Sequence, residues 1–599
     1  VDVKIGTGGH GHVFVGANVP FGMVQLGPTS IPQQWDWCSG YHDSDSTVIG
    51  FSHTHLSGTG IGDLFDVTVM PVTGDVTFAR GTEDEPDSGL WSYADRTREI
   101  ARPGYYSVPL LRYGITAELT ATNRAGLHRY TFPESDDAGI VIDLQNGGCW
   151  DKATETFIEA CGDDAVRGYR YSTGWADAQR IYFHAEFSKP FTDLHVHSID
   201  YKPLFAKADF STSEGEQILM KVGLSSVSME GACDNLMSEL PGWDFDAVAE
   251  AADREWNDEL GRIKVETSDE TARKVFYTAM YHAMIAPSTF SDSDGRYRGA
   301  DGNIHDDPGY TTYTTFSLWD TYRAAMPLYS IFQPERYTDF INTMLAICQE
   351  QGKLPVWHLH GCETDCMVGN PGIPPVADAI VKGFDGFDHE LAFEAMNISA
   401  LRPDRGQDHR MKYGYIPYDM FNESVAYDLE YALADGALAN AAKVLGKEED
   451  YLYFLERSKS YKELFDSSLR FIRGKDSNGR FRKEYSPFAS THRADDYCEG
   501  NGWQYTWLVP HDFRGLVECF GSKEAFLGKL DSLFTVSSVI EGAETSPDIS
   551  GLIGQYAHGN EPSHHILYFY TMAGQPWKTA DKVREVLGTL YSARPDGLS

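Results

Sequence analysis

Residues 244–263, DFDAVAEAADREWNDELGRI, mark the point at which the character of the sequence changes. Apolar residues recur there near the spacing of one helical face, which predicts an amphipathic helix. These residues are Phe245, Val248, Ala252, Trp256 and Leu260. Before this stretch the pattern is one of short strands and turns, and after it helical segments dominate. We therefore expect a helical linker over residues 236–266 that joins two domains of different class.

The sequence before the linker has the pattern of an all-β domain. Residues 115–119, 127–132 and 139–144 are short segments that either alternate in polarity or are continuously apolar. Clusters of Gly, Pro, Asn and Asp separate such segments, which is typical of strands joined by turns. We expect residues 1–235 to form a large antiparallel β-sandwich.

The sequence after the linker favours helices. Thr267 followed by Glu270 has the spacing of a capping box and predicts a helix start. Further helical segments are separated by long loops rich in Gly, Pro and aromatic residues, at 339–350, 424–444, 451–471, 523–533 and 577–590. Helices that pair in succession, with long loops at one end, favour an α/α barrel with a pocket built by the loops. We expect this barrel to occupy residues 267–599.

Composition limits the classes of partner. The chain has 599 residues, with 88 acidic against 50 basic side chains and a formal net charge of -38. Such a surface repels nucleic acid and anionic membranes, so we expect a neutral partner and no nucleic acid. No apolar run approaches the length that spans a bilayer, so we expect no membrane span.

The cysteines predict neither a disulfide framework nor a strong metal site. There are nine, an odd number, and they are scattered along the chain. Cys362 and Cys366 have no second ligand pair at the spacing of a zinc finger, so zinc is a minor alternative there.

Two short segments point to carbohydrate chemistry. Residues 499–505 (EGNGWQY) and 558–565 (HGNEPSHH) each set a carboxylate among glycine, amide, aromatic and imidazole groups. Such a set of side chains holds a neutral polyol by hydrogen bonds and stacking while one acid moves a proton. The aromatic content of 13% also suits sugar faces, although large cores use aromatic residues as well.

Three further segments carry candidate residues with two interpretations each. In residues 319–323 (WDTYR), Asp320 either forms a buried pair with Arg323 or accepts hydrogen bonds from two sugar hydroxyls. Glu363, with Asp365, is an acidic pair that can face the same pocket. Residues 53–63 (HTHLSGTGIGD) lack a clear third ligand for a metal site. Two interpretations therefore remain, structural histidines or a sugar-binding loop that carries Asp63.

Five segments, in order along the chain, resemble motifs of the calcium-dependent exo-α-mannosidases of glycoside hydrolase family 92. They are residues 6–28, 50–63, 318–323, 499–507 and 559–578. The resemblance implies an N-terminal β-sandwich and an (α/α)6 barrel with the pocket at their junction. It also implies removal of terminal α-linked mannose from mannan or N-glycan chains, assisted by Ca²⁺ and with inversion of the anomer. Mannose-containing oligosaccharides or glycoproteins are then the expected partners.

The resemblance also implies residue roles. Glu499 matches the general acid, and Trp503 and Tyr505 are expected to shield it from water and raise its pKa. Asn560 and Glu561 are expected to supply oxygens to the Ca²⁺ or to hold the substrate. The other expected substrate-binding residues are Trp35, Trp37, Asp63, Trp319, Asp320, Glu363, Gln504 and His558. The segments with Trp35, Trp37 and His558 resemble those of members that cut α-1,2 linkages.

The general base is expected outside the sequence as it stands. In the family, a turn like that of residues 595–598 (PDGL) leads into a segment with the base and a calcium ligand, so both are expected just beyond Ser599. We therefore expect the barrel domain to be truncated at its C-terminal end. The first residue is Val1 rather than Met, so we expect that a leader was removed or lies outside this sequence. The resemblance implies a secreted, periplasmic or cell-surface bacterial protein.

Two alternatives to the hydrolase remain. A sugar phosphorylase of the same architecture would gather Arg, Lys and His around its pocket, whereas the motifs here are acidic and neutral. If the chain ends at Ser599, a separate fragment completes the site, or the protein is a catalytically inactive mannan-binding protein.

Overall fold

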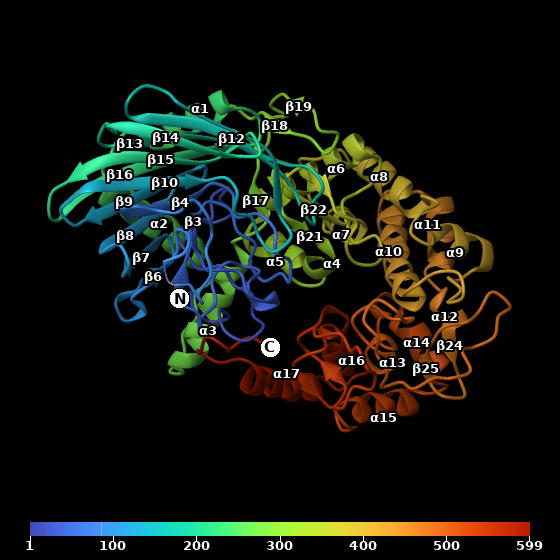
Figure 1. Ribbon diagram of the computed structural model, residues 1–599. Coiled ribbons are helices and arrows are strands. Elements are labelled where there is room, and N and C mark those ends of the chain that lie inside the picture. Colours follow the sequence, from blue (N-terminus) through green and yellow to red (C-terminus); the bar gives the residue numbers. More distant parts are fainter. Residues whose placement is uncertain (86) are drawn as a thin grey trace. The chain divides into compact units, whose positions relative to one another are not determined.

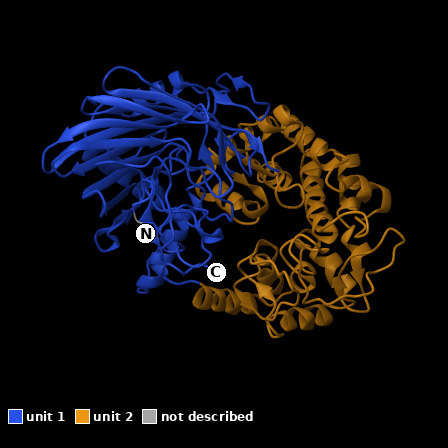
Figure 2. Ribbon diagram, viewed as in Figure 1, with its two compact units in different colours: residues 1–315, 359–364, 591–598 blue, residues 316–358, 365–590, 599 orange. Residues whose placement is uncertain are grey.

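The fold divides into two units, which are described separately (Figure 2). The structure is a computed structural model that describes residues 1–85 and 87–599. Unit 1 comprises residues 1–315, 359–364 and 591–598, and unit 2 comprises residues 316–358, 365–590 and 599. The expected order of an antiparallel β-sandwich followed by a helical domain is confirmed.

Unit 1 contains two large sheets in which all the described strand pairs are antiparallel. The eight-stranded sheet has the order β11 (Lys152–Ala160), β12 (Ala165–Thr173), β13 (Gln179–Phe187), β16 (Glu216–Ser225), β9 (Ala125–Phe132), β8 (Ile115–Ala121), β7 (Tyr105–Leu110) and β6 (Ile100–Arg102). The six-stranded sheet has the order β1 (Gly27–Thr29), β3 (Gly50–Ser52), β4 (Thr68–Thr73), β10 (Ser135–Asp143), β15 (Lys202–Thr212) and β14 (Asp193–Ile199).

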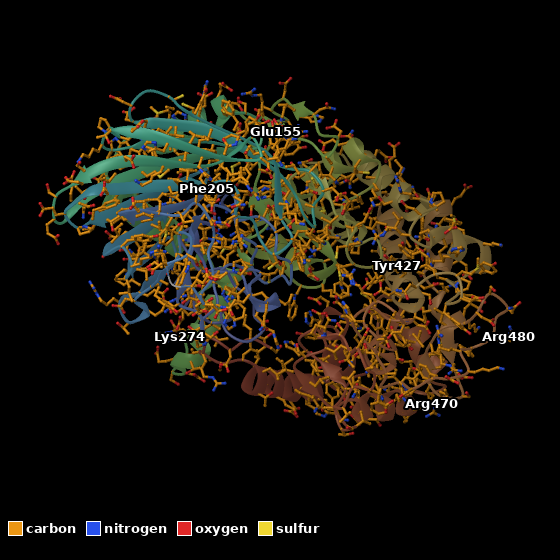
Figure 3. All side chains as sticks on the ribbon, in the orientation of Figure 1. Glu155, Phe205, Lys274, Tyr427, Arg470 and Arg480 are labelled. Atoms are coloured by element: carbon orange, nitrogen blue, oxygen red, sulfur yellow. The ribbon has the colours of Figure 1, made fainter. Side chains whose placement is uncertain are left out.

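The core of unit 1 lies between these sheets. Figure 1 shows their strands in layers, and β15 contacts β11 while β4 contacts β8. Residues along the strands alternate between buried and partly exposed, as in β12, because one face of each sheet packs inward. Phe205 of β15, labelled in Figure 3, is fully buried in this layer.

Short strand pairs complete the β-structure. They are β2 (Thr47–Val48) with β5 (Ser92–Tyr93), β17 (Ser288–Thr289) with β20 (Tyr313–Thr314), β18 (Tyr297–Arg298) with β19 (Ile304–His305), β21 (Phe316–Ser317) with β22 (Trp357–Leu359), β24 (Phe465–Asp466) with β25 (Phe471–Ile472), and β26 (Leu552–Ile553) with β27 (Tyr556–Ala557). Strand β23 spans Cys362–Glu363.

The helices predicted as a linker pack on the sandwich. Helix α1 (Met229–Glu239) contacts β16 and β13, and α2 (Phe245–Leu260) contacts β8. Phe245 and Leu236 join Leu127 of β9 in one buried apolar cluster. Trp256 is buried and its indole Nε1 donates to the carbonyl of Asn18 at 2.7 Å. The apolar stripe of residues 244–263 is thus covered by unit 1, which runs to residue 315, and the domain bounds expected from the sequence stay a prediction.

Helix α3 (Glu270–Ala283) begins as a helix but not with the predicted cap. Asp269 is the N-cap, and its carboxylate accepts from the backbone NH of Ala272 at 2.9 Å. Thr267 instead accepts from the backbone NH of Asp269 at 3.1 Å. Two capping residues two positions apart compete for the start of the helix, and the aspartate takes the N-cap position.

Unit 2 is helical. Its helices are α4 (Leu318–Thr321), α5 (Ala325–Phe332), α6 (Pro334–Gln351), α7 (Ile373–Val381), α8 (His389–Leu401), α9 (Gln407–Tyr413), α10 (Ser424–Val444), α11 (Glu448–Arg457), α12 (Tyr461–Leu464), α13 (Gly502–Tyr505), α14 (Phe513–Cys519), α15 (Lys523–Leu533), α16 (Phe569–Met572) and α17 (Pro576–Leu590). Figure 1 shows them following one another along an arc. The (α/α)6 arrangement itself stays a prediction.

In the described part of the chain, no helix combines the length and the apolar character that a membrane crossing requires.

Helix α10 is the most deeply buried helix element of unit 2. It contacts α7, α8 and α11, and buried residues occur on all of its faces. Its sequence is rich in alanine, so neighbouring helices approach closely, and its acidic residues Asp428, Glu430 and Asp435 are buried with it. Buried carboxylates require partners. One of these residues, Glu430, organises the candidate site.

The predicted helix over residues 451–471 is interrupted. Helix α11 ends at Arg457, α12 follows over Tyr461–Leu464, and the chain then turns into β24. Ser458 closes α11 and its hydroxyl donates to the carbonyl of Leu455 at 2.8 Å. Serine competes for backbone partners in this way, which favours a helix end.

A chain of hydrogen bonds links two buried histidines in unit 1. His53 Nδ1 lies 2.6 Å from the carbonyl of Val67, His53 Nε2 lies 3.0 Å from His128 Nε2, and His128 Nδ1 lies 2.7 Å from the Tyr130 hydroxyl. A carbonyl only accepts, so His53 donates through Nδ1 and its Nε2 accepts from His128. His53 must therefore be neutral, because a further proton on its Nε2 would set donor against donor at His128.

This pair predicts acid destabilisation of unit 1. Burial lowers the pKa of His53 to about 4 and that of His128 well below its usual range. Because the folded pKa lies below the unfolded value of 6.5, stability is retained above pH 6.5 and lost as the pH falls toward 4. For His53 the loss is roughly 3 kcal/mol. Urea unfolding midpoints at pH 7 and pH 4 measure it.

The variant His128→Gln separates this pair from other titrating groups. It removes one titrating ring and keeps a side chain that can donate to His53, so its midpoint should change less between the two pH values. His195→Gln, at an exposed position on β14, is the matched control. An equal pH dependence in the wild type and His128→Gln would contradict the prediction.

Candidate active site

The turn from β21 into α4 is anchored to helix α10 through Glu430. Trp319 Nε1 donates to Glu430 Oε1 at 3.0 Å, and the Tyr322 hydroxyl donates to Oε2 at 2.7 Å. Arg323 forms an ion pair with the same carboxylate, and its guanidinium lies 4.5 Å from the centre of the Tyr322 ring. Both Arg323 and Glu430 are almost fully buried. The interpretation in which Asp320 is the ion-pair partner of Arg323 is therefore wrong.

Asp320 instead shares a proton with Glu561. Their carboxyl groups are hydrogen-bonded, and burial together with the charge of Glu561 raises the pKa of Asp320 well above its usual range. Burial also raises the pKa of Glu561, but the Arg323 guanidinium and the proton donated by Asp320 oppose this shift. Asp320 is thus the protonated partner. Two carboxylates this close cannot both ionise without a cation between them.

Glu499 is a third acidic residue of the same site. Burial raises its pKa well above the usual range, and the carboxylates of Asp548, Glu561 and Asp320 raise it further. Arg493 opposes this shift. We call Asp320, Glu499, Asp548 and Glu561 the acid cluster. The pKa of Glu499 is therefore shifted in the direction that a general acid requires.

The backbone around Glu499 is fixed by side-chain amides. Glu499 has a positive φ of 49°, which is uncommon for a residue with a side chain. Asn560 Nδ2 donates to the Glu499 carbonyl at 2.6 Å, and Asn560 Oδ1 accepts from the NH of Glu561 at 3.0 Å. One side chain therefore holds two residues of the acid cluster in place.

Helix α13, which follows Glu499, is closed by a reciprocal cap. Asn501 Oδ1 accepts from the NH of Trp503 at 3.0 Å, and Gln504 Oε1 accepts from the NH of Asn501 at 2.9 Å. Gln504 Nε2 donates to the carbonyl of Gln555 at 3.0 Å. The Gln504 amide thus binds the protein itself through both atoms, which gives this predicted substrate-binding residue a supporting role.

Trp503 is also held by protein contacts. It is 6% exposed, and its ring meets Phe471 edge to face with the centroids 4.9 Å apart. The ammonium group of Lys529 lies 4.3 Å from the Trp503 ring centre. Trp503 thus packs under the turn that bears Glu499. Its expected contact with substrate stays a prediction.

The histidines of residues 558–565 are neutral. Burial lowers the pKa of His558 and His564 to about 4 and that of His565 to about 3. His558 Nδ1 lies 2.8 Å from the Tyr556 hydroxyl, and His564 Nε2 lies 3.0 Å from the carbonyl of His558. Neutral imidazoles next to the acid cluster do not compensate its negative charge, so they leave its carboxyl groups protonated.

Four of the predicted substrate-binding residues belong to unit 1. Trp35 Nε1 donates to the carbonyl of Gly60 at 2.9 Å, and Trp37 stacks on His42 with the ring centroids 4.4 Å apart. Glu363 lies in β23 and is partly buried. These roles stay predictions.

Asp63, the fourth of these residues, is fully buried. Its carboxylate accepts from the NH groups of Trp175 and Ala176 at 3.1 and 3.0 Å and from Gln179 Nε2 at 2.8 Å. These contacts make Asp63 an anchor for the loop at Trp175.

No metal site of three or more His, Cys, Asp or Glu side chains is present in residues 1–85 and 87–599. All nine cysteines, Cys362 and Cys366 included, are free thiols. The acid cluster does provide hard oxygen donors, and the proton shared by Asp320 and Glu561 occupies a place where a divalent cation would balance both charges. The donor chemistry at Glu561 therefore fits Ca²⁺, whereas Asn560 Oδ1 is already an acceptor within the protein.

Sequence reasoning missed Glu430 and Arg493, and it considered Asp548 only as a fallback for the general base. A signal existed for Glu430, because residues 424–444 are small and apolar on every face except for a few acidic residues. A helix of this kind is buried all round, so its carboxylates must find partners. No comparable pattern marks Asp548 or Arg493.

Comparisons with known proteins agree with this geometry. A family model for the glycosyl hydrolase family 92 N-terminal domain matches residues 1–225, and one for the family 92 catalytic domain matches residues 231–599. An α-mannosidase of this family from Bacteroides thetaiotaomicron, solved in complex with mannoimidazole, is 40% identical, with a TM-score of 0.96 over 100% of this chain and 81% of that one.

Two more distant relatives extend the comparison. An inverting family 92 mannosidase from the same organism is 28% identical, with a TM-score of 0.87 over 100% of this chain and 83% of that one. A protein of Arthroderma benhamiae, described as an uncharacterized secreted glycosidase, is 25% identical over 100% of this chain and 79% of its own length.

Glu430→Gln tests the anchoring of the β21–α4 turn. The substitution keeps the shape but leaves the buried Arg323 guanidinium without its carboxylate, so unit 2 should lose about 3–5 kcal/mol of stability. The exposed pair of Glu390 with Lys447 provides the control, because Glu390→Gln should cost less than about 1 kcal/mol. Urea unfolding measures both. A similar small loss for the two variants would contradict the role of Glu430.

Proposed function

The chain belongs to glycosyl hydrolase family 92 and is a glycoside hydrolase, and on that premise we propose that it is an exo-acting α-mannosidase. The observation that carries the proposal is the acid cluster of unit 2, in which burial and like charges raise the pKa of Glu499 well above its usual range. Support also comes from the relatives, which are named as α-mannosidases at 40% identity and as an inverting mannosidase at 28%.

Glu499 is proposed to protonate the glycosidic oxygen of the leaving sugar. A general acid must carry its proton at the working pH and give it up as the bond breaks. Burial and the neighbouring charges of Asp548 and Glu561 raise the pKa of Glu499, and Arg493 limits this shift. The carboxylate that activates water in an inverting reaction is the one expected beyond Ser599, and it stays a prediction.

The acid cluster favours a hydrolase over a phosphorylase. A phosphate nucleophile would enter beside Asp548 and Glu561, whose negative charges oppose it. Arg323, the guanidinium nearest Asp320 and Glu561, is already bound to Glu430. Water and neutral sugar hydroxyls have no such penalty, and the carboxylates of the cluster accept their hydrogen bonds.

We further propose that Ca²⁺ assists the reaction. Glu561, with oxygens of the sugar, would hold the ion, and a bound Ca²⁺ would orient the hydroxyls of the mannose ring. The chain's own residues prepare for this, because Arg323 and Asp320 already keep the charge on Glu561.

We propose terminal α-1,2-linked mannose of mannan or N-glycan chains as the preferred substrate. The support for this linkage is the sequence of the segments around Trp35, Trp37 and His558. We also propose that the protein acts as a secreted, periplasmic or cell-surface enzyme of a bacterium, in line with the relative described as secreted.

The first product anomer and the linkage preference test this function directly. In proton NMR of full-length protein with α-1,2-mannobiose, β-mannose should appear first, and α-mannose should follow only by mutarotation. Release from α-1,3- and α-1,6-mannobiose should be slower. Initial α-mannose would refute inversion, and equal rates on all three disaccharides would refute the linkage preference alone.

Glu499→Gln tests the general acid. Hydrolysis of a mannobiose should fall by about 10²–10⁴-fold, because its leaving group needs a proton. An aryl α-mannoside with an acidic phenol as leaving group should lose less than about tenfold. Glu484→Gln, at an exposed position, is the control. Equal losses on both substrates would remove Glu499 from this role.

Chelation tests the proposed ion. Full-length protein treated with EGTA should lose activity, and Ca²⁺ should restore it where Mg²⁺ does not, because Mg²⁺ demands a stricter octahedral geometry. Glu561→Gln should need about tenfold more Ca²⁺ for half-restoration, which corresponds to a loss of roughly 1.4 kcal/mol. Activity that survives exhaustive chelation would contradict the proposal.

A further inference from the structure

The side chain of Lys529 lies against two aromatic rings in unit 2. Its ammonium nitrogen is 3.5 Å from the centre of the Phe471 ring and 4.3 Å from the centre of the Trp503 ring. Phe471 belongs to β25, Trp503 to α13 and Lys529 to α15, and the two rings meet edge to face. A cation over the face of an aromatic ring is attracted by its π-electrons, more strongly where water is excluded. Lys529 therefore ties α15 to the helix that follows Glu499.

Among the residues that the structure describes, the ammonium group of Lys529 has no ion-pair or hydrogen-bond partner. Burial lowers the pKa of Lys529 to about 8, and the charge of Arg470 adds to this shift. Arg470 is exposed in the turn between β24 and β25 (Figure 3), and no other charged group of the described chain acts on Lys529. The two rings are therefore the groups that hold this ammonium in place.

Trp503 transmits this constraint to the backbone of α13. It is 6% exposed, and its NH donates to Asn501 Oδ1 at 3.0 Å. The helix also packs closely on its surroundings, because a Cβ atom on Gly502 would lie 2.0 Å from the Tyr485 hydroxyl oxygen. In packing this close, a shift of the Trp503 ring requires a shift of the backbone that carries it.

The last residue of α13 holds the peptide bond that precedes Glu499. Tyr505 is fully buried, and its hydroxyl donates to the carbonyl of Cys498 at 2.5 Å. This carbonyl belongs to the rigid peptide plane from which the φ angle of Glu499, 49°, is measured. The direction of the Glu499 side chain therefore depends on the position of α13.

We propose that Lys529 is a positioning residue for Glu499, because its ammonium group, through Trp503 and α13, holds the Glu499 carboxyl group in the direction of proton donation. This inference rests on the proposed function of Glu499 as the general acid. A general acid that points in the wrong direction slows only the reactions whose leaving group needs its proton. The effect of Lys529 should therefore depend on the leaving group.

Lys529→Met and Lys529→Arg test this role in full-length protein. Lys529→Met keeps a long apolar side chain but removes the charge, so its kcat on α-1,2-mannobiose should fall by about fivefold to tenfold, with KM nearly unchanged. Its kcat on the aryl α-mannoside with an acidic phenol should fall by less than about twofold, which also shows that the variant is folded. Lys529→Arg should recover most of the loss, because a guanidinium also binds over aromatic rings. Lys523→Met, at an exposed position of the same helix, is the control and should behave like the wild type.

The pH dependence separates the charge of Lys529 from its packing. Because the pKa of Lys529 is about 8, most of its ammonium groups lose their proton by pH 9.5, whereas the guanidinium of Lys529→Arg stays charged. The kcat of Lys529→Arg on mannobiose, divided by that of the wild type, should therefore rise by about fivefold between pH 7 and pH 9.5. Titration of Glu499 is common to both proteins and cancels in this ratio. The corresponding ratio for Lys523→Arg should stay constant.

The outcomes separate the role of Lys529 from that of Glu499. Four results would overturn the positioning role alone: a wild-type kcat on mannobiose in Lys529→Met, an equal loss on both substrates, no recovery in Lys529→Arg, or a ratio that does not change with pH. Equal losses on both substrates in Glu499→Gln would instead overturn the general acid, and the role of Lys529 would fall with it.

Discussion

The candidate site depends on a shortage of buried positive charge. Arg323 is buried next to Glu430, Glu561 and Asp320, and its direct ion pair goes to Glu430. One guanidinium balances one carboxylate, so Asp320 and Glu561 are left to share a proton, and Glu499 beside them keeps its own. The protonated acid therefore arises from the count of charges in unit 2 rather than from any single contact.

Unit 1 handles buried charge in the opposite way. Asp63 accepts from neutral donors, and Arg170 is bound by both Asp66 and Asp151, so the charged groups there have direct partners. Networks in which charged groups have direct partners fix loops in one arrangement. In unit 2, too few positive charges lie beside the acid cluster, so its carboxyl groups hold protons. The same residue types thus serve positioning in one unit and proton transfer in the other.

The sequence predicted most of what depends on local pattern. The segments 424–444 and 523–533 are helices α10 and α15. What could not be predicted depends on distant residues. Glu430 is separated from Arg323 by 107 positions, and the covered face of residues 244–263 needs the sandwich as its partner. The cap at Asp269 instead reflects a local competition with Thr267, and the two residues differ little in free energy as N-caps.

Asn560 gives the site a mechanical property. Its amide nitrogen holds the carbonyl of Glu499 and its oxygen holds the NH of Glu561, so a single rigid plane of atoms spans the two loops. Any ligand that displaces Glu561 must also shift the backbone on which Glu499 is mounted. The loops that carry Glu499 and Glu561 therefore move together. A ligand bound at Glu561 changes the direction in which the carboxyl group of Glu499 points.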